Sequence, residues 1–167
     1  MKSNIAIILM FFIVLLAGCQ NELRPSEMNT NDLPDERAFQ DEFTREFLQS
    51  AEETRPGYYP LLSKTGRYKM DFPASGVISK NFYSIKNNSY ETLGFAMINE
   101  DQTGNHVTLI YYGEHTMDEI DFHLDFFQGR IGEVTEFEKI EDLNKSIYYS
   151  YKEFPDTFDH VAYIQNT

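Results

Sequence analysis

Hydrophobic and polar positions along the chain follow three different spacings, and each predicts a different kind of segment. The first is an unbroken apolar run, Ile5 to Leu16, preceded by the positive charge of Lys2. A basic end followed by a short apolar run is typical of a secretory signal, whereas a transmembrane helix needs roughly 20 apolar residues. We therefore expect residues 1–18 to be a signal peptide.

The second spacing is helical and follows a polar stretch. Residues 20–34 are polar and aperiodic, which is typical of a flexible tether. Over residues 35–54 apolar side chains then recur at every fourth position: Phe39, Phe43, Phe47 and Ala51. This pattern predicts an N-terminal amphipathic helix at 35–54.

The third spacing is the period of two that is typical of half-buried strands. It begins near Gly66 and continues, with turn residues between the runs, to the end of the chain. The strands are expected at about residues 68–72, 81–87, 92–98, 106–112, 135–140, 146–152 and 160–165. The order of elements predicts an α+β fold: an antiparallel sheet of about six to seven strands (66–165) with helices packed on it, preceded by the N-terminal helix, as a single domain over 35–167.

A second helix interrupts the strands at about residues 117–128. Its apolar stripe faces the core, and Phe122 and Phe126 lie nearly opposite that stripe. Aromatic residues on both sides indicate either a helix packed between two layers or an apolar patch for a partner. In the first case the Phe39, Phe43 and Phe47 stripe would cover Phe122 and Phe126, and this is the interpretation we favour.

The strand region has a resemblance to a known family. Tyr-Lys-Met-Asp-Phe-Pro at 68–73, a hairpin ending in Val-Thr-Leu-Ile-Tyr-Tyr at 107–112, one helix and then tyrosine-rich strands resemble the PsbP-like α-β-α sandwich family over about 65–165. The resemblance implies an extracytoplasmic assembly or binding module rather than an enzyme. That family usually closes with a terminal helix, whereas this chain ends just after a strand.

Cys19 refines the interpretation of the N-terminus. Leu16-Ala17-Gly18-Cys19 resembles the lipobox of bacterial lipoproteins, which implies cleavage before Cys19 and lipid on its thiol. The alternatives are an uncleaved signal anchor and an ordinary secretory signal. Cys19 is the only cysteine, so the remaining 149 residues have no disulfide and must be held by their core. Residues 19–34 would then be the lipidated cysteine and its tether.

Charge excludes one class of partner. Removing residues 1–18 leaves 13 basic and 27 acidic side chains, a net charge of −14. Such a surface repels nucleic acid and anionic lipid head groups, because both bind through cationic contacts. We therefore expect no nucleic-acid binding, and membrane attachment through the lipid on Cys19 alone.

The second helix also contains a pattern that could bind a metal. His115, Glu119 and His123 are spaced by four residues, and imidazole with carboxylate can bind zinc. However, Thr116 to Glu119 matches a capping box, which would place His115 before the helix and off that face. We favour the cap and predict no metal site, no cofactor and no catalytic residues, since no nucleophile motif or phosphate loop is recognisable.

Outward-facing aromatic residues are the remaining candidates for a binding surface. The candidates are Tyr112, Tyr149, Tyr151, Phe122 and Phe126. Aromatic residues also suit the half-buried surface of a sheet, so each has a purely structural alternative. The leading hypothesis is a non-enzymatic, membrane-anchored lipoprotein that binds another envelope or extracellular protein as an accessory, assembly or protective factor. The alternative is a small-molecule or cation receptor, for which the loop Asn99–Asn105 offers clustered oxygen atoms.

Overall fold

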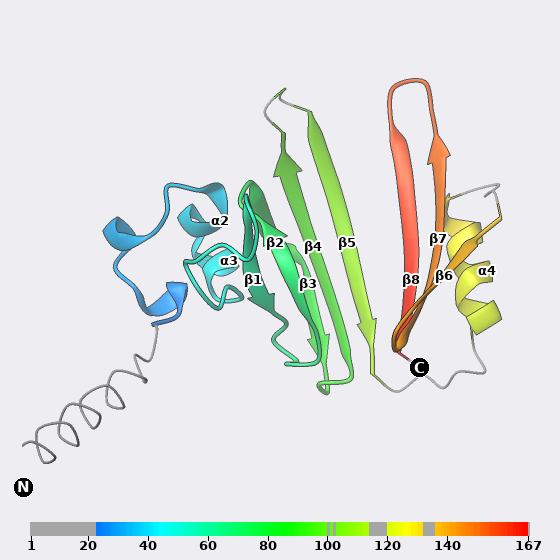
Figure 1. The fold of residues 1–167 in the computed structure, drawn as a ribbon, viewed down its shortest axis with the longest axis horizontal. Coiled ribbons are helices and arrows are strands. Elements are labelled where there is room, and N and C mark those ends of the chain that lie inside the picture. Colours follow the sequence, from blue (N-terminus) through cyan, green and yellow to red (C-terminus); the bar gives the residue numbers. More distant parts are fainter. Residues whose placement is uncertain (1–22, 100, 102, 114–119, 132–135, 167) are drawn as a thin grey trace, which may run out of the picture. The chain divides into compact units, whose positions relative to one another are not determined.

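The computed structural model describes residues 23–99, 101, 103–113, 120–131 and 136–166. Contacts between residues divide the chain into two compact units, residues 1–113 and residues 114–167. We call them the N-terminal unit and the C-terminal unit, and describe each by itself. Their helices and strands are labelled in Figure 1.

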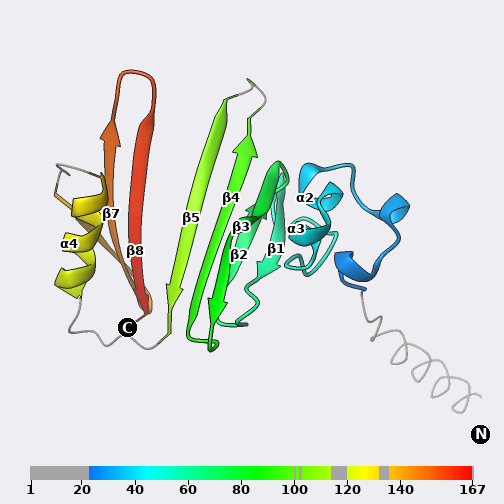
Figure 2. The same ribbon diagram turned by 180° about the vertical axis from the view of Figure 1, so that it is seen from behind.

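In the described part of the N-terminal unit, short helical turns are combined with five strands. Its helical turns are η1 (Pro25–Glu27), η2 (Thr30–Asp32), α2 (Arg37–Gln40) and α3 (Glu42–Arg45). Its strands are β1 (Tyr58–Leu62), β2 (Lys69–Pro73), β3 (Gly76–Lys86), β4 (Tyr90–Ile98) and β5 (Gly104–Tyr112). β1 and β2 form one antiparallel sheet, and β3, β4 and β5 form a second in that order. Both views show α2 and α3 beside β1 to β3 (Figures 1 and 2).

The single helix expected over residues 35–54 is wrong. Asp41 has extended backbone (φ −87°, ψ 118°) between α2 and α3. Its carboxylate accepts hydrogen bonds from the backbone N–H of Thr44 at 2.7 Å and from the Thr44 hydroxyl at 2.6 Å. Such a cap starts a new helix and divides the old one. Beyond α3 the chain turns at Glu46 and Phe47, and Leu48 forms an antiparallel bridge with Leu61.

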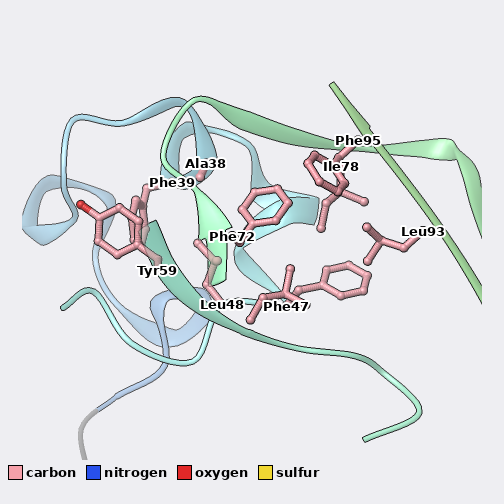
Figure 3. Close-up of a cluster of buried hydrophobic side chains, with 10 residues drawn as sticks. Ala38, Phe39, Phe47, Leu48, Tyr59, Phe72, Ile78, Leu93 and Phe95 are labelled. Carbon is pink, nitrogen blue, oxygen red and sulfur yellow. The ribbon is translucent and has the colours of Figure 1, made fainter. Parts of the chain in front are cut away.

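The phenylalanines of that segment nevertheless form the core of the N-terminal unit. Phe39 and Phe47 are buried with Phe72, Leu61 and Leu93, in the cluster that Figure 3 shows in part. Burying a side chain of this size stabilises the fold by roughly 1.5–3 kcal/mol. The aromatic stripe is therefore packed within its own unit, on the strands that follow it.

The described residues of the C-terminal unit form one helix and one sheet. α4 (Ile120–Ile131) is followed by β6 (Glu138–Asp142), β7 (Lys145–Glu153) and β8 (Phe158–Asn166). The three strands are antiparallel, with β7 in the centre. Both views show α4 beside this sheet (Figures 1 and 2).

The predicted fold class, an antiparallel sheet of six to seven strands with helices packed on it, is also wrong. The described residues form three antiparallel sheets of two or three strands each, and the described helices are mostly short. The PsbP-like resemblance, with the α-β-α sandwich that it implies, is not shown by these elements and stays a prediction. Alternation identifies a strand and its two faces, but the pairing of strands depends on tertiary contacts that this pattern does not contain. In the described part of the chain, no helix is long and apolar enough to cross a membrane.

Candidate functional site

The residues predicted as a partner surface lie on three elements. Tyr112 ends β5 in the N-terminal unit, where its ring packs edge-on against Tyr90 with 5.3 Å between centroids. Phe122 and Phe126 lie on α4, and Tyr149 and Tyr151 lie on β7. The structure brings Tyr149 and Tyr151 together, with ring centroids 6.3 Å apart. Cys19 lies outside the described residues.

Among the described residues of the C-terminal unit, a helix covers one face of the sheet and leaves the other face uncovered. Along β8, exposed and half-buried residues alternate from His160 to the end of the strand. On β7, Ser146 and Ser150 are buried, and the residues between and beyond them are more exposed. Since successive residues of a strand point to opposite faces, the register assigns Tyr149, Tyr151, Phe158 and His160 to the uncovered face.

Helix α4 covers the other face. The His123 ring stacks on the Tyr163 ring at 5.2 Å between centroids, with 19° between the planes. His123 is buried, and α4 packs against strand β8. Phe122 and Phe126 are 67% and 43% exposed on the same helix. The uncovered side of the sheet is therefore the side away from His123, and we call it the outer face.

Three rings with nearly parallel planes lie close together on the outer face. The Tyr149 hydroxyl and His160 Nδ1 are 2.5 Å apart, and the two ring planes differ by 21°. This hydrogen bond holds the two rings beside each other with nearly parallel planes. The Tyr151 ring lies 5.9 Å from that of His160, tilted by 27°. We call Tyr149, Tyr151 and His160 the aromatic platform.

Apolar side chains extend the platform. The Phe158 ring packs on that of His160 at 5.0 Å and 78°, and Phe158 is 56% exposed. Ile140 and Ile164 lie on the same face, as their pairing with Ile147 shows, and are 50% and 59% exposed. Large apolar side chains exposed side by side are typical of a surface that binds a partner.

Carboxylates lie beside these rings. Glu138 pairs with Tyr149 across β6 and β7, and Glu153 pairs with Phe158 across β7 and β8. Residues 114–167 carry 13 acidic and four basic side chains, a net charge of −9 within a chain of −13. By the same register, the outer face of the sheet carries Glu138, Asp142 and Glu153 beside one lysine, Lys145, so carboxylates outnumber cations on it.

A buried polar centre in the N-terminal unit escaped the sequence prediction. Glu91 on β4 is fully buried, and its carboxylate accepts hydrogen bonds from the backbone N–H of Lys64 (3.1 Å), the backbone N–H of Thr65 (3.1 Å) and the Thr65 hydroxyl (2.7 Å). The signal was present in the sequence, because alternation places Glu91 on the face of Leu93 and Phe95. The carboxylate fastens the turn between β1 and β2 to the second sheet.

Two tyrosines near Glu91 are affected by it. Burial, and then the Glu91 charge, raise the pKa of Tyr83 to about 12. The same two causes, in the same order, raise the pKa of Tyr68 strongly. The Tyr68 hydroxyl is buried and has no hydrogen-bond partner among the described residues. All of these interactions organise the unit internally, so we assign this centre to stability.

The loop Asn99–Asn105, considered as a cation site, uses its Asp101 carboxylate for hydrogen bonds within the loop. The Asp101 carboxylate accepts hydrogen bonds from the backbone N–H of Thr103 at 2.9 Å and from its hydroxyl at 2.6 Å. These hydrogen bonds lower the pKa of Asp101. Glu100 and Gln102 lie outside the described residues. The Asp101 oxygens thus shape the turn between β4 and β5.

The described residues contain no group of three or more His, Cys, Asp or Glu side chains that could hold a metal ion. His115, Glu119 and the capping Thr116 lie outside the described part of the chain.

The N-terminal segment contributes an open hollow of about 360 Å³ beside Phe39 and Arg45. The Arg45 guanidinium there donates to the Phe39 carbonyl at 2.6 Å, so it is used within the fold.

Comparison with known proteins places the chain in a family. The family model described as "Putative lipoprotein YvcA" matches residues 34–167. A protein of Bacillus subtilis (strain 168) with the same description is 31% identical over 179 residues, covering 96% of this chain and 73% of the relative. No solved structure matches the chain significantly. The chain therefore belongs to the YvcA lipoprotein family.

Proposed function

We propose that this lipoprotein is held outside the cytoplasm by lipid on Cys19 and acts there as a non-enzymatic module that binds another protein. The role would be that of an accessory, assembly or protective factor. The observation that carries the proposal is the outer face of the C-terminal sheet, with its aromatic platform and exposed Phe158. The Leu16–Cys19 lipobox and the family of lipoproteins support the anchor.

Protein binding suits this face better than membrane contact. Tyrosine rings carry much of the binding energy at protein interfaces, because they bury a large area and lose little conformational entropy. The Tyr149–His160 hydrogen bond holds two rings in place before any partner arrives, which lowers the entropic cost of binding. An anionic membrane would be repelled by the net charge of −9 on residues 114–167.

Loss of partner binding without loss of stability tests the proposal. We expect a full chain with Tyr151→Thr and Phe158→Thr to lose the protein that the wild type recovers from detergent-solubilised envelopes. Both side chains are more than half exposed, so the free energy of unfolding should change by no more than about 1 kcal/mol in total. The matched control is Phe82→Thr in the N-terminal unit, where Phe82 is 61% exposed. If the double variant and the control recover the same partner, the outer face is not the binding surface.

The anchor needs a separate test. Cys19→Ser removes the thiol that lipid would join, so the variant should move to the aqueous phase of a detergent partition and incorporate no labelled palmitate. Gln20→Ser, at the next position, is the control and should stay with the detergent. Equal partition and labelling of Cys19→Ser and the wild type would contradict lipidation at Cys19.

A further inference from the structure

We infer that the segment of the partner that docks on the outer face is cationic, rich in lysine or arginine. This inference rests on the proposed protein-binding function and adds the chemistry of the partner. On the outer face, glutamate carboxylates stand next to aromatic rings.

Each end of the aromatic group has its own carboxylate. Glu138 stands directly opposite Tyr149, and Glu153 stands directly opposite Phe158. Residues paired in this way have Cβ atoms roughly 4.5–5.5 Å apart and project from the same face. A basic side chain that lies over one of these rings therefore lies within reach of a carboxylate.

The outer face offers exposed rings to such a side chain. Tyr151 and Phe158 are 51% and 56% exposed, so part of each ring is accessible from solvent. The face of an aromatic ring attracts a cation within about 6 Å of its centroid. A ring face with a neighbouring carboxylate is therefore complementary to lysine or arginine.

Charge also selects among the possible occupants. Residues 114–167 carry −9, whereas residues 1–113 carry −4, from 10 basic and 14 acidic side chains. A second copy of the acidic outer face would be repelled by the first, and an anionic lipid surface would be repelled as well. A cationic polypeptide gains from the aromatic contact and from the charge at once.

A labelled peptide with alternating lysine and glycine is the probe, and the same peptide with glutamine for lysine is its control. Fluorescence anisotropy measures both on the full chain in an uncharged detergent, at low and at high salt. We expect the lysine peptide to bind more tightly and to weaken with salt. Glu138→Gln, Glu153→Gln and Tyr151→Thr should each raise its Kd about threefold.

Asp159→Asn is the matched charge control. Asp159 lies on the same sheet and pairs with Lys152 on the face turned toward α4. The substitution Asp159→Asn removes the same charge as Glu153→Gln, and it should leave the Kd of the lysine peptide unchanged. If Asp159→Asn weakened peptide binding as much as Glu153→Gln, the binding would come from the overall negative charge and not from the outer face. That result would overturn the inference.

The remaining outcomes separate this inference from the proposed function. Equal binding of the glutamine peptide would show a surface for neutral ligands, and self-association of the chain at the outer face would show a second copy as occupant. Either result would overturn the inference that the docked segment is cationic. If an envelope partner still depends on Tyr151 and Phe158 while no lysine preference is measured, the proposed function stands and this inference fails. If neither is found, both fail.

Discussion

At the scale of single residues, the Glu91 carboxylate holds the two sheets of the N-terminal unit together. It receives three hydrogen bonds from two residues of the turn between β1 and β2, although it belongs to β4 of the other sheet. Hydrogen bonds to a buried charge are stronger than those between neutral groups, and leaving one of their donors unsatisfied is costly. Glu91 therefore joins two sheets that share no strand pairing.

The first prediction concerns this carboxylate. Glu91→Gln keeps one acceptor but turns an amide NH₂ toward a donor of the turn, so we expect a loss of about 2 kcal/mol in the free energy of unfolding. Thermal denaturation should show the melting temperature lower by about 4–8 °C. Glu153→Gln, at an exposed position of the other unit, is the control. A melting temperature of Glu91→Gln equal to that of the wild type would remove Glu91 from the stabilising interactions.

The second prediction concerns alkaline pH. Tyr83 has a pKa raised to about 12 in the folded chain, against an ordinary value of 10.0, and the pKa of Tyr68 is raised as well. Below pH 10 both phenols are neutral in the folded and unfolded chain, so their stabilising effect is complete. As pH rises from 10 toward 12, the unfolded chain ionises first, and the free energy of unfolding falls.

Replacing both tyrosines with phenylalanine removes this dependence. The variant Tyr68→Phe with Tyr83→Phe should unfold at a higher pH than the wild type, as circular dichroism during a base titration would show. Tyr151→Phe is the control, because its hydroxyl lies outside the polar centre around Glu91. An unchanged alkaline midpoint in the double variant would mean that these phenols ionise alike in the folded and unfolded chain.

At the scale of elements, the segment from Phe39 to Phe47 shows what a spacing can and cannot predict. The apolar period of four correctly identified side chains that pack together, because Phe39 and Phe47 are both in the core. It did not identify the backbone, because Asp41 caps a second helix and the chain beyond α3 pairs with β1. Asp41 followed three residues later by Thr44 was the available signal for this break.

The third prediction follows from that cap. Asp41→Ala removes the acceptor of the Thr44 backbone N–H and hydroxyl, so we expect a loss of about 1 kcal/mol, measured by denaturant unfolding. The Thr44 hydroxyl also accepts a hydrogen bond from the backbone N–H of Ile78, so the effect should extend to β3. Asp35→Ala is the control, because Asp35 is exposed and its carboxylate accepts a hydrogen bond from the exposed Gln40 side chain. Equal loss in the two variants would contradict a specific role for the cap.

Strand prediction succeeded where the alternation was regular. The strands expected near 92–98 and 106–112 are β4 and β5, and those near 146–152 and 160–165 are β7 and β8, each with shifted ends. β1 was missed because Pro60 interrupts its pattern and usually argues against a strand. The strands were thus predictable from local pattern, whereas their division into three sheets depends on contacts between distant residues.

The candidate site was predictable to a similar degree. Alternation placed Tyr149 and Tyr151 on one face, and both are on the outer face. The sequence could not show that His160 and Phe158 join them, because that depends on the register of β7 with β8. Tyr112 belongs to the other unit, and Phe122 and Phe126 lie on α4, so these predicted residues are not part of the platform.

At the scale of the whole molecule, charge and aromatic surface are concentrated in the same unit. Residues 114–167 hold a net −9 of the chain's −13, and their sheet carries the aromatic platform on its outer face. The N-terminal unit uses its own aromatic residues to build a core around Phe47 and Phe72. We therefore propose a division of roles, in which the C-terminal unit binds the partner.

Photocrosslinking in living cells tests that claim most directly. A photoreactive phenylalanine analogue would replace Phe158 on the outer face, or Phe82 in the N-terminal unit as a control with matched exposure (56% and 61%). We expect a discrete crosslinked protein from position 158 and none of the same identity from position 82. A crosslink of equal strength to the same protein from position 82, or none from position 158, would contradict it.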